Sequence, residues 1–173
     1  MNRLLFAALA FAFASASPAW AETLRFPKTG PAFVINEPAG WSHSDQRDGT
    51  LVMASPDGAI LMTFAIADNA AGRTIDEEAS YTASKAGAGR PEKKAAKVIS
   101  GHFGHEYDAI IPDSARGRVR LHYFFVAMND GRYAGAMTMM PETVDAGRRA
   151  EAEAIYDGVT ITGDSTSPLN SWR

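Results

Sequence analysis

Two histidines and a glutamate stand close together in the segment Gly101-His102-Phe103-Gly104-His105-Glu106. Imidazole nitrogens and carboxylate oxygens are ligands of zinc and copper, and a tight site takes three or four of them. His102, His105 and Glu106 are therefore a candidate ligand or metal site, although the spacing offers two clear ligands and no evident third. Ordinary surface histidines at the solvated tip of a hairpin explain the same residues without a metal.

A second candidate site lies at Arg118, Arg120 and His122, which alternate along the chain. Alternate residues of a β-strand share one face, so the three side chains should project together. Arginines presented in this way can hold a carboxylate or phosphate through two parallel hydrogen bonds. The alternative is that these basic side chains extend into solvent at the exposed end of a strand. The pattern thus predicts either an anion site or a solvated strand end.

The motifs of several common enzyme classes are missing from the chain. It contains no cysteine, which excludes cysteine nucleophiles, cysteine zinc sites and iron–sulfur clusters. HExxH, GxSxG, SxxK, Walker and dinucleotide-binding patterns are also absent from the sequence. The loop 42–49 carries His43, Asp45 and Asp48 but no obvious nucleophile for acid–base chemistry. We therefore expect a protein that is not an enzyme and that carries no cofactor.

The first 21 residues have the pattern of a secretory signal. Arg3 supplies a positive charge, residues 4–14 are apolar without interruption, and Ala19-x-Ala21 has the small residues that signal peptidase requires. The apolar run is too short to span a bilayer. We expect cleavage after Ala21 and a periplasmic or secreted mature chain, with a membrane anchor as the alternative.

Charge narrows the range of partners. The chain has a formal net charge of −3, and removal of Arg3 with the signal makes the mature protein more negative by one. Nucleic acids and anionic membranes attract basic proteins, so neither is an expected partner. No long apolar stretch follows the signal, so we expect no stable membrane insertion after cleavage. The oligomeric state is left open.

The clearest structural signal is a β-hairpin around Asn129-Asp130-Gly131. Apolar runs flank this tripeptide on both sides, and Asp-Gly between β-forming residues favours a tight turn. If Asp130 and Gly131 form a two-residue loop, Phe125 pairs with Ala136 and Phe124 with Met137. Both faces of the hairpin are apolar, so it should lie in the middle of a sheet and be covered on both sides.

Two helices are predicted among shorter strands. Thr74-Ile-Asp-Glu77 matches a capping box and should start a helix that ends near Ala86. Thr143 is the predicted N-cap of a second helix to about Tyr156, with a buried face of small residues at Ala146, Gly147, Ala150 and Ala154. Further strands are expected at 33–37, 51–54, 59–67, 95–100, 105–111 and 159–162, with a polar lead-in at 22–31 and a loop at 42–49.

The short connections between strands favour antiparallel pairing, because parallel crossovers need a dozen or more residues. We therefore predict one α+β domain over residues 22–163, with a mainly antiparallel sheet of about six to eight strands and helices packed on it. Residues 164–173 are expected to form a flexible tail.

The segment Phe33-Val-Ile-Asn-Glu-Pro-Ala-Gly-Trp41 resembles the opening of PsbP-like proteins, a group that includes the Ran-binding Mog protein and several exported bacterial proteins. The resemblance continues as an order of elements through the capped helix and the Asp130-Gly131 hairpin. It implies an α/β/α sandwich around an antiparallel sheet, and proteins that mostly dock onto larger complexes without catalysing reactions. The sequence therefore favours an exported binding or accessory module with a protein partner, and the alternative is a periplasmic protein that binds a small ligand or metal.

Overall fold

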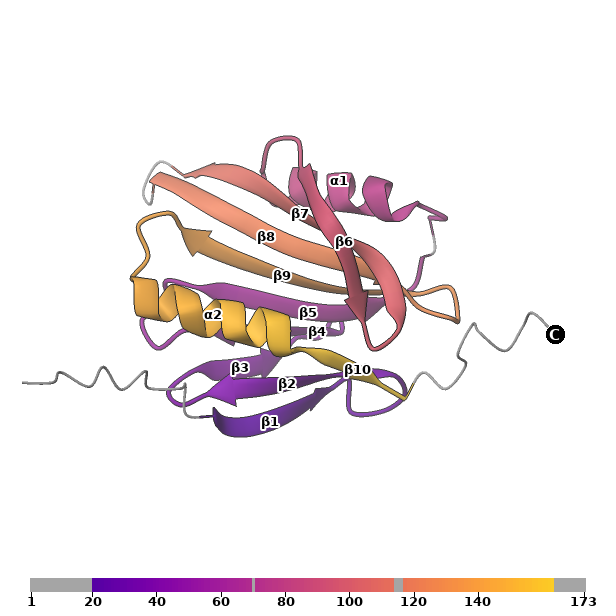
Figure 1. The fold of residues 1–173 in the computed structure, drawn as a ribbon, viewed down its shortest axis with the longest axis horizontal. Coiled ribbons are helices and arrows are strands. Elements are labelled where there is room, and N and C mark those ends of the chain that lie inside the picture. Colours follow the sequence, from indigo (N-terminus) through magenta and orange to yellow (C-terminus); the bar gives the residue numbers. More distant parts are fainter. Residues whose placement is uncertain (1–19, 70, 114–116, 164–173) are drawn as a thin grey trace, which may run out of the picture.

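The computed structural model describes residues 20–69, 71–113 and 117–163. A large antiparallel sheet forms the middle layer (Figure 1). Helix α2 (Ala146–Gly158) and a small sheet cover one face, and helix α1 (Ile75–Lys85) lies on the other. The predicted α+β class and antiparallel sheet are confirmed. Most of the predicted signal and the predicted tail lie outside the described residues.

Within the described residues, the large sheet has seven strands and the small sheet has three, and every pair is antiparallel. The small sheet has the order β1-β2-β10, with β1 (Trp20–Phe26), β2 (Ala32–Pro38) and β10 (Thr160–Thr162). The order of the large sheet is β3 (Ser42–Asp45), β4 (Thr50–Ala54), β5 (Leu61–Ala67), β9 (Tyr133–Pro141), β8 (Gly117–Ala127), β7 (His102–Asp113) and β6 (Glu92–Ile99).

The hairpin of β8 and β9 lies mid-sheet as predicted, but its register differs from the prediction by one residue. Phe124 pairs with Ala136 and Phe125 with Gly135. The reason is the loop length, because Met128 N–H bonds to the Arg132 carbonyl and leaves three loop residues, with Gly131 at φ 84°. Phe124 and Phe125 still point to opposite faces of the sheet, as expected.

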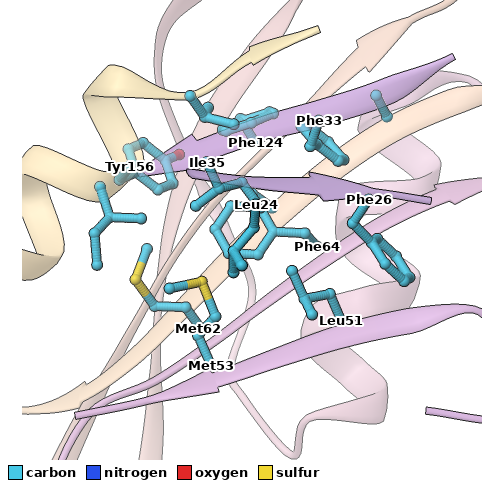
Figure 2. Close-up of a cluster of buried hydrophobic side chains, with 14 of the residues drawn as sticks. Leu24, Phe26, Phe33, Ile35, Leu51, Met53, Met62, Phe64, Phe124 and Tyr156 are labelled. Carbon is cyan, nitrogen blue, oxygen red and sulfur yellow. The ribbon is translucent and has the colours of Figure 1, made fainter. Parts of the chain in front are cut away.

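The main core fills the space between the large sheet, the small sheet and α2 (Figure 2). Phe33 and Phe64 meet edge to face with ring centroids 5.7 Å apart, which joins the two sheets. The side chains of Ile35, Met53 and Met62 are fully buried beside them. Met128 and Met140 are buried as well, so these four methionines fill space in the core.

The second core lies under α1, on the opposite face. The predicted capping box is present, with the Thr74 side chain accepting from Glu77 N–H and the Glu77 carboxylate accepting from Thr74 N–H. Ala79 and Ala83 are buried against β7 and β8, and Tyr123 donates its hydroxyl hydrogen to the Ala79 carbonyl at 2.8 Å. Within the described residues, no helix is long and apolar enough to cross a membrane.

The second predicted helix is present, but its N-cap and its buried face differ from the prediction, and two segments predicted as irregular contain strands. The N-cap of α2 is Asp145 and not Thr143, because the Asp145 carboxylate accepts from the amides of Gly147 and Arg148. The predicted face of small residues is not the buried one, because Ala146, Gly147 and Ala150 are exposed and α2 instead buries Ala152, Ile155 and Tyr156. The lead-in at 22–31 contains most of β1, and the loop at 42–49 contains β3.

Candidate functional site

The structure does not bring the three predicted ligand or metal-site residues together. His105 projects toward α1, where its Nδ1 lies 3.8 Å from an Asp76 carboxylate oxygen. Glu106 is the next residue on β7 and faces the α2 side, where its carboxylate lies 3.5 Å from Lys97 Nζ. His102 stands four residues from Glu106 at the start of the strand and is buried. Among the described residues, no group of three acidic, histidine or cysteine side chains could hold a metal ion.

The predicted anion-site residues do share one face of β8, the face toward α2, but they already have carboxylate partners. Arg118 is exposed and lies 3.6 Å from Glu142. Arg120 forms a two-pronged contact with Asp108, with Nε at 3.1 Å and one terminal nitrogen at 2.9 Å. His122 Nδ1 lies 2.7 Å from the same carboxylate. The anion that this face was expected to recruit is thus supplied by the protein itself.

Asp108 is the centre of this network. Its side chain is largely buried, and desolvation alone would raise the pKa of its carboxyl. Hydrogen bonds from Arg120 and His122 outweigh desolvation and lower that pKa below its ordinary value. The same contact raises the pKa of Arg120. Asp108, His122 and Thr138 stand opposite one another in register on three adjacent strands.

A cavity of about 220 Å³ lies between this network and α2, and we call it the α2 pocket. The rings of His122 and Tyr156 meet in it with centroids 4.5 Å apart. Thr138 and Tyr156 contribute to its lining, but their hydroxyl oxygens are buried away from it, and neither oxygen has a hydrogen-bond partner within the described residues. Three carboxylates, those of Glu106, Glu153 and Asp157, complete its lining together with Arg120, Met140 and Ala152.

Lys97 closes one side of this region. Its ammonium lies 3.5 Å from Glu106 and 3.4 Å from Asp157, and 4.6 Å from the centre of the Tyr156 ring. Lys93 and Lys94 of the same strand also face carboxylates. Each of these three lysines of β6 therefore has an acidic side chain within ion-pair distance.

A second cavity of about 300 Å³ lies on the opposite face, beside α1, and we call it the α1 groove. The helix covers β7 and β8 but leaves parts of β5 and β9 open. The groove is lined mainly by apolar atoms of Ala65, Phe125, Gly135 and Met137. A Cβ atom on Gly135 would lie 2.6 Å from a ring carbon of Phe125, so the glycine gives the Phe125 ring its place.

Polar side chains frame the α1 groove at one end. Tyr133 donates to the Arg73 carbonyl and accepts from Asn69 Nδ2 at 3.1 Å. Glu78 on α1 is held by Arg73 at 3.0 Å. The charged side chains that line the groove, among the described residues, are the two carboxylates of Asp68 and Glu78. The groove thus combines an apolar floor with an acidic edge.

These layers occur in solved structures. Cyanobacterial PsbP (CyanoP) from Synechocystis sp. PCC 6803 superimposes with a TM-score of 0.57 over 87% of this chain and 98% of its own, at 12% identity. The protein has a PsbP-like fold. LpqN from Mycobacterium tuberculosis, described as involved in cell envelope biogenesis, gives a TM-score of 0.53 over 82% of this chain and 91% of its own, at 9% identity. No protein-family model and no curated protein sequence matches this chain.

The PsbP-like sandwich places several residues at the two cavities that the sequence patterns did not single out. Thr138 and Tyr156 reach the α2 pocket from β9 and α2, which are predicted elements with no motif at these positions. In the sequence, Gly135 is an ordinary small residue of an apolar strand, but in the structure it packs against the Phe125 ring. The cross-strand row of Asp108, His122 and Thr138 could be recognised only once the register of β7, β8 and β9 was known.

Proposed function

We propose that this protein is an exported, non-catalytic binding module, and that its α1 groove receives an apolar segment of a partner protein. The observation that carries the proposal is the incomplete cover of one sheet face. Helix α1 is only 11 residues long and packs on β7 and β8, so apolar side chains of neighbouring strands stay half-exposed. Exposed apolar concavities of this kind are typical of sites that bind ligands or protein segments.

The chemistry of the groove favours one kind of partner segment. Its floor suits an apolar side chain, because Phe125 and Met137 offer adaptable apolar surface. Its lining charges are the carboxylates of Asp68 and Glu78, and Arg73 pairs with Glu78. A segment with a lysine or arginine next to its apolar anchor would complement this edge. We infer a partner motif that is apolar and basic.

Export is the second part of the proposal. It is supported by the charged, apolar and small-residue regions that precede Glu22, and it accords with the cell-envelope role in the description of LpqN. Cleavage after Ala21 would shorten β1 but leave five of its residues, Glu22–Phe26, paired with β2. The small sheet can therefore persist in the mature chain.

Expression of the full chain in a Gram-negative bacterium tests export directly. We expect the protein in the periplasmic or culture fraction. Its intact mass should be that of the chain without residues 1–21, and N-terminal sequencing should start at Glu22. Ala19→Asp, which removes a small residue from the cleavage site, should block processing. A cytoplasmic protein that keeps residues 1–21 would contradict export.

A substitution that fills the groove tests the binding site. Ala65 is half-buried on β5 and lies opposite Gly135, so Ala65→Leu places an apolar side chain into the cavity. Random peptides displayed on phage and selected against the mature protein should be enriched in apolar residues next to lysine or arginine. Ala65→Leu should lower the affinity of the protein for the selected peptides by about tenfold or more.

Ala54→Leu is the matched control, because Ala54 is also half-exposed on a neighbouring strand but does not line the groove. It should bind the selected peptides as the unmodified protein does. Selection of acidic peptides, or equal loss of peptide binding in both variants, would contradict the proposed site.

Small-ligand binding is the alternative function, and the specific observation that favours it is the α2 pocket.

A further inference from the structure

We propose that the α1 groove binds the chain's own C-terminal segment, residues 164–173, with the Trp172 ring on its floor and the Arg173 guanidinium at its acidic edge. The inference rests on the groove being a binding site, as proposed above, and it names a second occupant that competes there with the partner protein. Four features carry it: the composition of the segment, the place where β10 ends, the length of the segment and the fit of the two side chains.

The C-terminal segment contains the kind of motif that the groove favours. Its sequence is Asp-Ser-Thr-Ser-Pro-Leu-Asn-Ser-Trp-Arg, in which the aromatic Trp172 directly precedes the basic Arg173. Tryptophan and arginine are enriched among the residues that contribute most to binding energy at interfaces. The other residues are mainly small or polar, so Trp172 is the natural apolar anchor, with Leu169 as the one other large apolar side chain of the segment.

Strand β10 ends at the same end of the molecule as the groove. Ile161 pairs with Phe33 in the small sheet, and the Phe33 ring packs on Phe64 of β5. The next residue of β5, Ala65, points to the opposite face and lines the groove. Figure 1 shows β10 ending on the side of the molecule where β5 leads toward α1, and Asp68 of that connection lines the groove as well.

The segment is long enough to reach the groove. Packed sheets lie about 10 Å apart, and the groove lies on the far face of the large sheet, so the path around the sheet end is roughly 20 Å. Trp172 follows Gly163 by nine residues, and nine residues can extend to about 30 Å. The anchor can therefore reach the groove of its own chain.

The groove has room for the anchor. Its cavity of about 300 Å³ holds on the order of ten water-sized groups of about 30 Å³ each, and an indole side chain has about ten non-hydrogen atoms. The Phe125 ring and the Met137 thioether both line the cavity and offer favourable contacts to an indole. The size and the chemistry of the floor thus suit Trp172.

The acidic edge of the groove complements the basic end of the motif. Asp68 and Glu78 are the charged residues of the lining among the described residues, and Arg73 pairs with Glu78 at 3.0 Å. The Asp68 carboxylate is therefore the one that we assign to the Arg173 guanidinium.

Attachment to the same chain makes a weak contact sufficient. A short linker gives the segment an effective concentration of about a millimolar at the groove, so a Kd of about 1 mM already fills the groove about half of the time. A partner peptide must displace the segment, and its apparent affinity falls with the fraction of the groove that is occupied.

Methyl NMR of the mature protein with its full C-terminal segment tests the contact without a partner. We expect the Ala65 and Met137 methyl signals to shift in Trp172→Ala, because the indole ring no longer lies against them. Ser165→Ala is the matched control, because Ser165 belongs to the segment but not to the motif, and both signals should stay in place. The shifts should be the same in dilute and concentrated samples, since the contact lies within one chain.

Removal of the anchor should also free the groove for a partner. Trp172→Ala should bind the selected apolar and basic peptides about twofold to tenfold more tightly than the unmodified protein does, whereas Ser165→Ala should bind them equally.

Unchanged methyl signals in Trp172→Ala would overturn the inference, and so would shifts that grow with protein concentration, because these would place the segment in a second copy. Equal peptide affinities of Trp172→Ala and the unmodified protein would overturn it as well, while leaving the groove as a partner site. Failure of the proposed function is a different result, namely selected peptides that Ala65→Leu does not weaken.

Discussion

Gly104→Ala is expected to lower the free energy of unfolding by on the order of 3 kcal/mol, or to prevent folding altogether. A Cβ atom at this position would lie 1.8 Å from the carbonyl oxygen of Phe125 and 2.7 Å from the Cα atom of Val126. Both are backbone atoms of β8, so no side-chain rotation can relieve the contact. The contact can be relieved only if β7 moves away from β8 at the pair of Gly104 and Val126.

Two other glycines give graded controls for urea unfolding. In Gly135→Ala the added Cβ atom would lie 2.6 and 2.7 Å from ring carbons of Phe125. Because the ring can move, we expect the free energy of unfolding to fall by about 1 kcal/mol. Gly89→Ala has open space around it and should change stability by about 0.5 kcal/mol or less. A Gly104→Ala protein as stable as Gly89→Ala would show that the β7–β8 pair does not approach as closely as described.

Of the two crowded glycines, Gly135 is the one that lies at the α1 groove, because Gly104 is on the same face of β7 as Glu106, the α2 side. Gly135 on β9 accommodates the Phe125 ring. The half-buried ring forms part of the groove floor. Gly135→Ala should push this ring from its place and weaken peptide binding at the groove more than it lowers stability.

Local signals predicted the elements better than their partners. The capping box at Thr74 and Glu77 places the start of α1 correctly, because its hydrogen bonds join residues three apart in sequence. The Asp130-Gly131 turn predicts the hairpin but not its register, since loops of two and three residues fit the same sequence. The first strand was missed because β1 depends on pairing with β2 and carries a polar sequence that ends before Pro27.

For the candidate sites too, the sequence predicted which side chains share a face but not which residues they contact. Alternation places Arg120 and His122 on one face, and this holds in the structure. Their partner Asp108 lies 12 residues before Arg120 on another strand, so only the register brings it into contact. His105 and Glu106 separate because β7 continues as a regular strand, which sends adjacent side chains to opposite faces.

Asp108→Ala is expected to lower the free energy of unfolding at pH 7 by about 2–3 kcal/mol. The substitution leaves the Arg120 guanidinium and the His122 ring partly buried without the carboxylate that both contact. Loss of one partner of such a cluster costs more than the pair contributes, because the remaining charge stays desolvated. Asp108→Asn retains an acceptor oxygen and should lose about half as much.

The pH dependence of stability distinguishes the charge of Asp108 from its shape. The folded-state pKa of this carboxyl is lowered, so near that pKa the unfolded chain binds more protons than the folded one. Its stabilisation is complete above the ordinary aspartate pKa of about 4 and is lost as pH falls through the lower folded value. The free energy of unfolding, measured with urea, should therefore differ less between the unmodified protein and Asp108→Asn as the pH falls from 5 toward about 2.

A constant difference between these two proteins across that range would mean that the Asp108 carboxylate contributes only through hydrogen-bond geometry. Arg118→Ala provides the comparison, because its contact with Glu142 is 3.6 Å long and exposed, and it should cost about 0.5 kcal/mol or less. The contrast between the two arginine contacts follows from burial. The Asp108 carboxylate held by Arg120 is 16% exposed, whereas the Glu142 carboxylate held by Arg118 is 44% exposed. The first contact therefore fixes β7 to β8 beside the α2 pocket, and the second has little effect on the fold.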